Sequence, residues 1–136
     1  MKAIKILFFT VLVISINVSC SANTGKKDKN TEAPQAVKVE VYYFHYTHRC
    51  ATCRAVESVS KEAVADLYGN KVSFTGYNLD EKAGEAKGKE LGVSGQTLLI
   101  VAGDKKIDIT NEGFMNARSN PDKLKQIIKE KIDSLL

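Results

Sequence analysis

The chain has 136 residues, of which 43% are hydrophobic and 26% are charged. That length and apolar content suit one compact domain and give no reason to expect a second. The formal net charge of +4 falls to +2 without Lys2 and Lys5, which is too weak a positive charge to indicate a nucleic-acid partner.

Residues 1–19 are predicted to be a signal peptide. Lys2 and Lys5 precede an apolar run over 6–16, which is shorter than the roughly 20 residues of a membrane-crossing helix. The following Asn17-Val18-Ser19-Cys20 resembles the bacterial lipoprotein cleavage box, although the box usually has Leu at the position of Asn17. The resemblance implies a lipid on Cys20 and a domain held in the bacterial cell envelope, facing the periplasm or the outside. Plain secretion with a free Cys20 is the alternative.

Residues 20–36 are predicted to be the lipidated cysteine and a flexible linker. The stretch 21–36 contains no large apolar residue and is rich in Lys, Asn, Thr and Ala. Such a segment cannot contribute to a core, so it is expected to tether the domain that follows.

The first strand and the first helix of the domain are predicted on either side of a cysteine pair. Apolar side chains at every second position indicate a strand over 37–44. Apolar side chains at helical spacing indicate a helix over 53–68, which Gly69-Asn70 ends. Cys50-Ala51-Thr52-Cys53 therefore lies at a junction from strand to helix.

The rest of the chain is predicted to add three strands and two helices. Gly84, Gly88 and Gly92 fall on one face of the first of these helices, where they allow close packing against a sheet. Residues 110–118 are interpreted as a long connection before the last helix. The predicted elements are a strand over 71–78, a helix capped by Asp80 that runs to Leu91, a hairpin of 97–102 with 107–109, and a helix capped by Asn120 with Pro121 at its first position.

The order β-α-β-α-β-β-α over 37–136, with CxxC after the first strand, resembles the thioredoxin-like fold superfamily. The resemblance implies an α/β three-layer sandwich with a central mixed sheet. More narrowly, the segments YYFHYTHRCATCRAVE and TNEGFMNAR resemble a family of small secreted proteins named nitrophenyl-compound nitroreductase subunit, the ArsF family. No GxGxxG follows a strand, so no flavin or nicotinamide cofactor is expected.

Three positions depart from the thioredoxin pattern. Gln96, before Thr97, stands where thioredoxins have a cis-proline that shapes the groove for a partner's backbone. Arg49 replaces the usual Trp before the first cysteine. Phe44 replaces an acidic residue that thioredoxins bury, so proton transfer to the second thiol needs another route.

Cys50 is the candidate nucleophile and Cys53 the candidate resolving thiol, because a thiolate is favoured at a helix N-terminus. The charges of Arg49 and His48 would favour that thiolate if their side chains turn toward the sulfur. Without Cys20, these two cysteines form the single dithiol of the chain. The leading hypothesis is thiol–disulfide exchange with protein or small thiol partners, which would make the protein a thiol–disulfide oxidoreductase.

Three other interpretations stay open from the sequence. His45, His48, Cys50 and Cys53 include ligand types suited to zinc or copper, and the two thiolates alone suit trivalent arsenic. The cysteine pair can also be an inert surface disulfide, or belong to a redox-inert accessory subunit. Phe114 is a candidate for a partner surface together with Gln96 and Thr97, although it can equally close the end of the core. The sequence does not set the oligomeric state.

Overall fold

The computed structural model describes residues 37–136. The predicted signal peptide over 1–19, the lipid site at Cys20 and the linker over 20–36 lie outside the described residues, so these expectations stay predictions. The elements are β1 (Val39–His45), α1 (Ala51–Tyr68), a short 3-10 helix (Gly69–Lys71), β2 (Val72–Asn78), α2 (Lys82–Leu91), β3 (Thr97–Ala102), β4 (Lys105–Asp108), α3 (Thr110–Asn116) and α4 (Pro121–Asp133).

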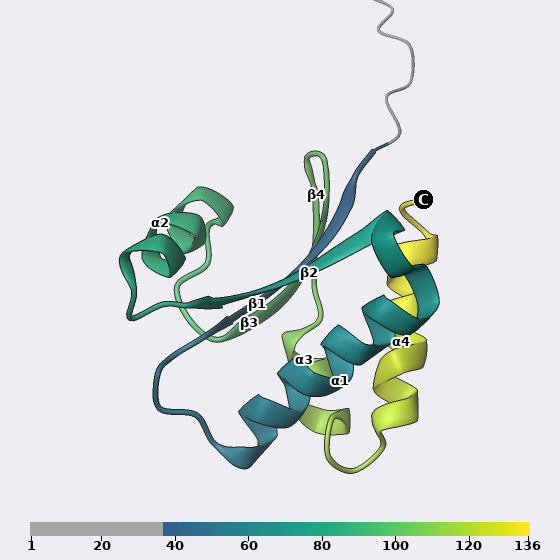
Figure 1. Cartoon of the computed structure of the whole chain (residues 1–136), viewed down its shortest axis with the longest axis horizontal. Coiled ribbons are helices and arrows are strands. Elements are labelled where there is room, and N and C mark those ends of the chain that lie inside the picture. Colours follow the sequence, from purple (N-terminus) through teal and green to yellow (C-terminus); the bar gives the residue numbers. More distant parts are fainter. Residues whose placement is uncertain (1–36) are drawn as a thin grey trace, which may run out of the picture. The chain divides into compact units, whose positions relative to one another are not determined.

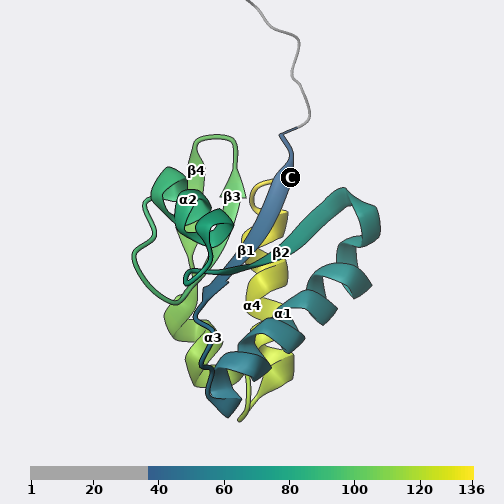
Figure 2. The same ribbon diagram turned by 60° about the vertical axis from the view of Figure 1, so that its left-hand side comes forward.

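The four strands form one mixed sheet in the order β2-β1-β3-β4. β1 runs parallel to β2 and antiparallel to β3, and β3 and β4 form the predicted hairpin. Helices α1, α3 and α4 cover one face of the sheet and α2 covers the other (Figures 1 and 2). The predicted α/β three-layer arrangement with a central mixed sheet is therefore confirmed.

Alternation along β1 supplies both faces of the sheet. Val39, Val41 and Tyr43 belong to the large core under α1 and α4, whereas Tyr42 and Phe44 belong to a smaller core under α2. The pattern is hydrophobic at nearly every position because β1 is central and covered on both faces. In the large core α4 contributes Leu124, Ile128 and Ile132, all fully buried.

The glycines of α2 confirm the prediction of close packing at two of three positions. A Cβ on Gly84 would lie 1.9 Å from the backbone oxygen of Asn78, and one on Gly88 would lie 3.1 Å from the Leu79 side chain. Gly92 has another role, because its φ of 75° makes it the left-handed residue that ends the helix.

Two predictions about helix starts and loops are wrong. Asp80 does not cap α2: the N-cap is Glu81, and Asp80 Oδ2 instead accepts a hydrogen bond from the Thr47 backbone N–H at 2.7 Å. Part of the predicted connection over 110–118 is helix α3. Thr110 Oγ1 accepts from the Leu98 N–H at 2.9 Å, and Gly113 packs against Val56 and Leu98. These contacts are long-range, so they left no local signal. At the other helix, Asn120 caps α4 as predicted, with its side chain accepting from the Lys123 N–H.

Candidate functional site

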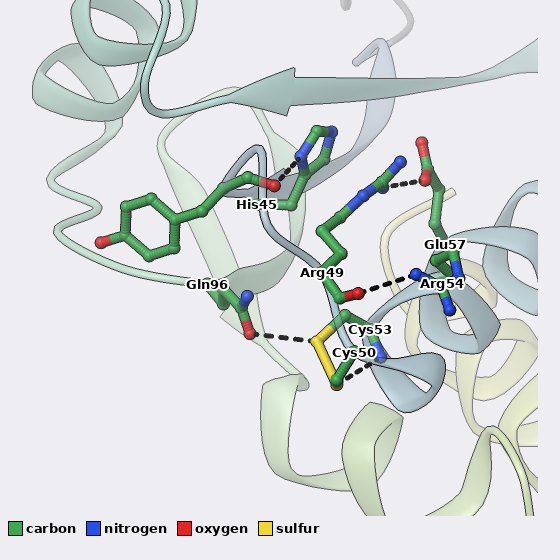
Figure 3. A network of polar contacts seen from close by, with 8 residues as sticks. His45, Arg49, Cys50, Cys53, Arg54, Glu57 and Gln96 are labelled. Atoms are coloured by element: carbon green, nitrogen blue, oxygen red, sulfur yellow. Dashed lines mark hydrogen bonds and ion pairs between the residues drawn. A yellow bond between two sulfur atoms is a disulfide. The ribbon is translucent and has the colours of Figure 1, made fainter.

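Cys50 and Cys53 form a disulfide at the start of α1 (Figure 3). Cys50 is the N-cap residue in an extended conformation, and its Sγ accepts a hydrogen bond from the Cys53 backbone N–H at 3.2 Å. Cys50 is exposed, whereas Cys53 is only 4% exposed. The first sulfur is therefore accessible to a partner and already receives a backbone donor at the positive end of the helix dipole.

The Arg49 side chain runs away from the disulfide and forms an ion pair with Glu57 of α1 (Figure 3). Both members are partly buried, with side-chain exposures of 24% and 28%. The structure therefore pairs the Arg49 guanidinium with a carboxylate and does not turn it toward the sulfur. The backbone oxygen of Arg49 accepts a hydrogen bond from the Arg54 guanidinium at 2.7 Å, which fixes the residue before Cys50.

Hydrogen bonds to the end of β2 and to the loop after β2 hold the segment between β1 and α1. Thr47 donates its backbone N–H to Asp80, and Asn78 Nδ2 donates to Thr47 Oγ1 at 3.0 Å. The Thr47 donors lower the pKa of the Asp80 carboxyl, and the charges of His48 and His45 add to this effect. His48 itself is exposed in this loop.

Gln96 lies beside the buried cysteine. Because Thr97 pairs with Phe44 in the β1–β3 register, Gln96 lies at the carboxyl end of β1. Gln96 Oε1 lies 3.6 Å from Cys53 Sγ. In the reduced protein a Cys53 thiol at this distance would donate a weak hydrogen bond to that oxygen. Thr97 is less directed toward the site, because its Oγ1 bonds the Gly95 oxygen at 3.0 Å.

Phe114 packs against the large core from α3. This position agrees with the interpretation in which Phe114 closes the end of the core. Its neighbour Met115 is 75% exposed and does not contribute to the core.

A surface hollow of about 280 Å³ lies between the loop after β1 and the loop before β3. Tyr46 and Ser94 form two of its walls, and the Tyr46 hydroxyl donates to the Ser94 oxygen at 3.4 Å. Leu79 and Val93 add apolar side chains. Glu85 and Lys89 of α2 complete its lining. The same two loops also carry Arg49 and Gln96.

The predicted alternative set of metal ligands is not gathered while the disulfide is closed. His45 Nδ1 lies 3.1 Å from the Tyr46 carbonyl oxygen, and its ring lies 5.9 Å from the Tyr43 ring. Over residues 37–136 no group of three or more His, Cys, Asp and Glu side chains is placed to hold a metal ion. Binding by the reduced thiols stays a prediction.

Two features of the site had not been predicted from the sequence. Glu57, which pairs with Arg49, lies one helical turn after Cys53, a spacing that was readable from the predicted helix. The Tyr43 hydroxyl is buried near this pair and has no hydrogen-bond partner among residues 37–136. Burial raises the pKa of Tyr43 to about 12, and the charge of Arg49 opposes that rise.

Comparison with known proteins supports the fold. The chain is similar to the crystal structure of oxidised thioredoxin O2 from Arabidopsis thaliana, with 23% identity, a TM-score of 0.50, and coverage of 70% of this chain and 75% of that chain. It is also similar to a structure described as a malarial protein, with 18% identity, a TM-score of 0.45, and coverage of 68% and 96%. No family model and no curated protein matches the sequence. The first likeness and the strand order show a thioredoxin-like fold.

Proposed function

We propose that this protein exchanges disulfides with thiol partners through Cys50 and Cys53. The observation that carries the proposal is the arrangement of the two sulfurs. Cys50 is exposed at the N-cap of α1 and accepts the Cys53 N–H, while its disulfide partner Cys53 is buried behind it. A disulfide that closes so short a loop stabilises a fold little, which favours a reactive role over a structural one.

The first step uses the exposed cysteine. In the reduced chain the Cys50 thiolate attacks one sulfur of a partner disulfide and forms a mixed disulfide, and the other partner sulfur leaves as a thiolate that takes up a proton. The Cys53 N–H and the α1 dipole stabilise the attacking thiolate.

The second step uses the buried cysteine. Cys53 loses its proton to a base and attacks Cys50 Sγ, which re-forms the intramolecular disulfide and releases the second partner thiolate. The partner is reduced by two electrons and the chain is oxidised by two. The same steps in reverse oxidise a partner dithiol.

Protein partners are supported by a hollow on the two loops that also carry Arg49 and Gln96. Tyr46, Leu79 and Val93 give it apolar surface, and Glu85 and Lys89 of α2 give it charged surface. A polypeptide segment can place a side chain in such a hollow while its own cysteine reaches Cys50.

We further propose that the domain works in the bacterial cell envelope, bound to the membrane through a lipid on Cys20. Two features of the sequence support this proposal: Lys2 and Lys5 precede an apolar run before Cys20, and the segment over 21–36 contains no large apolar residue. Over residues 37–136 no helix is long and apolar enough to cross a membrane. Membership of the ArsF family stays a prediction that rests on the segments 42–57 and 110–118. Mass spectrometry of the native protein would test the lipid, and an unmodified Cys20 would contradict it.

The reaction is tested by reduction of insulin with dithiothreitol as electron donor. We expect the wild-type chain to accelerate insulin precipitation and Cys50→Ser to abolish the acceleration. In a Cys53→Ser variant the mixed disulfide on Cys50 is expected to persist, which would allow the partner to be isolated from envelope extracts. Equal rates for the wild type and Cys50→Ser would contradict the proposal and favour the accessory-subunit alternative. A stable adduct of the reduced chain with zinc, copper(I) or arsenite in native mass spectrometry would favour metal binding.

A further inference from the structure

The residue before the nucleophile is part of a half-buried ion pair. Arg49 precedes Cys50, and its guanidinium meets the Glu57 carboxylate. Glu57 lies four positions after Cys53 on α1, so the two side chains occupy neighbouring places on one helix face. Arg49 is thus adjacent in sequence to one cysteine, and Glu57 lies one helical turn after the other.

The fold makes room for this pair above the sheet. A Cβ on Gly76 of β2 would lie 2.8 Å from Glu57 Oε1 and 3.8 Å from His45 Nε2, so the carboxylate occupies the space of a missing side chain. The buried Tyr43 hydroxyl is close enough for both Arg49 and Glu57 to act on its pKa. Charges so enclosed are screened less by water than surface charges, so they act more strongly on their neighbours.

We propose that Glu57 is a positioning residue that sets the redox poise of the dithiol by holding and offsetting the charge of Arg49. With Glu57 ionised, the guanidinium stays paired with the carboxylate over Gly76 and its charge is compensated, so the Cys50 thiolate is stabilised less than an unpaired Arg49 would stabilise it. This inference rests on the proposed thiol–disulfide exchange.

The two charges therefore have opposite effects on one equilibrium. The oxidised chain and two glutathione thiols give the reduced chain and one glutathione disulfide, with two electrons transferred to the chain. Stabilising the Cys50 thiolate shifts this equilibrium toward the reduced chain, which makes the chain a stronger oxidant.

The test compares Glu57→Gln with Arg49→Gln in the full chain. In Glu57→Gln we expect the thiolate absorbance of Cys50 to titrate at lower pH and the equilibrium constant with glutathione to rise about threefold to tenfold. Tenfold corresponds to about 30 mV in the reduction potential. In Arg49→Gln we expect both quantities to move in the opposite direction, because an uncompensated carboxylate then remains one helical turn after Cys53.

Matched variants separate this effect from loss of structure. Glu62 lies further along α1 and forms an ion pair with Lys125 of α4, with 2.8 Å between the charged atoms and more exposure than the Arg49–Glu57 pair. Glu62→Gln breaks that pair and should shift neither quantity. Arg49→Lys keeps the charge and should stay near the wild type. Gly76→Ala keeps every charge but displaces the Glu57 carboxylate, so it should shift the titration in the direction of Glu57→Gln. The ionisable side chains of Tyr43, His45, His48 and Arg54 stay unchanged in all of these variants.

Shifts of equal sign in Glu57→Gln and Arg49→Gln, or shifts no larger than that of Glu62→Gln, would overturn the inference. Should Glu57→Gln fail to fold, an unshifted Gly76→Ala overturns it equally. If the wild-type chain does not reduce insulin, the proposed function fails, but the thiolate titration still reports whether the ion pair acts on Cys50.

Discussion

Replacement of Gln96 by Glu is expected to slow the second half of the exchange reaction. Gln96 Oε1 lies 3.6 Å from Cys53 Sγ, so a carboxylate there would face the buried sulfur at nearly the same distance. A negative charge at that place opposes formation of the Cys53 thiolate, which must attack the mixed disulfide. The Gln96 contact is with Cys53 and not with Cys50. The first half of the reaction, in which Cys50 attacks the partner disulfide, should therefore change less.

The size of this effect follows from the distance. Two unit charges 4 Å apart repel by about 4 kcal/mol at an effective dielectric constant of about 20, and by about 1 kcal/mol in bulk water. Gln96 is only partly buried, so water screens part of the repulsion. Even about 1 kcal/mol lowers the thiolate population about fivefold. We therefore expect resolution to slow by at least about fivefold.

Ellman's reagent separates the two halves, since each half releases one coloured thionitrobenzoate ion. In Gln96→Glu the first release should stay within about twofold of the wild type, while the second slows at least fivefold. Gln96→Met has a side chain of similar size that is uncharged like that of Gln96, so its second release should stay near the wild-type rate. An unchanged second release, or a first release slowed more than the second, would refute the proposed place of Gln96 beside Cys53.

Three further predictions concern stability. Tyr43→Phe removes a buried hydroxyl without a partner and should raise the free energy of unfolding at neutral pH by about 1 kcal/mol. Because the pKa of Tyr43 is raised in the fold from 10.0 to about 12, the wild type should also lose stability as pH rises from 10 toward 12, and Phe should remove that loss in urea titrations. Gly84→Ala should destabilise by about 1–3 kcal/mol despite the better helix propensity of Ala, since its Cβ would lie 1.9 Å from the Asn78 backbone oxygen. Gly88→Ala should cost less, because its Cβ would lie 3.1 Å from the Leu79 side chain and 3.2 Å from the Val93 backbone oxygen; equal losses would refute this. Asn120→Ala should cost about 1 kcal/mol through loss of the α4 cap, and an unchanged thermal midpoint would contradict it.

Most elements of the fold were predictable because their signals are local. The alternation along β1, the cap and proline at the start of α4, and the glycine after α1 each depend on neighbours in sequence. The start of α2 and the existence of α3 were not predicted. Asp80 has the chemistry of a cap, but its carboxylate accepts from the Thr47 N–H of another loop. At the start of α3, Thr110 accepts from the N–H of Leu98, twelve positions earlier.

The sequence also located the cysteine pair and assigned the exposed and buried roles, since a CxxC after a strand starts a helix with its first residue outermost. The surroundings of the pair needed the tertiary structure. The sequence placed Arg49 next to Cys50, which suggested a charge beside the sulfur. In the structure α1 packs over Gly76, and the Arg49 guanidinium pairs with Glu57 instead.

What the sequence by itself determined is the dithiol at a strand-to-helix junction and the order of elements around it, because periodicity, caps and turn residues act over a few positions. Only the tertiary structure decided which side chain lies beside the buried sulfur and which one pairs with Arg49. Gln96 reaches Cys53 across 43 positions through the β1–β3 register, and Glu57 meets Arg49 because α1 packs on β2 where a glycine leaves space. Contacts of that kind depend on how separate elements pack, which no local pattern in the chain records.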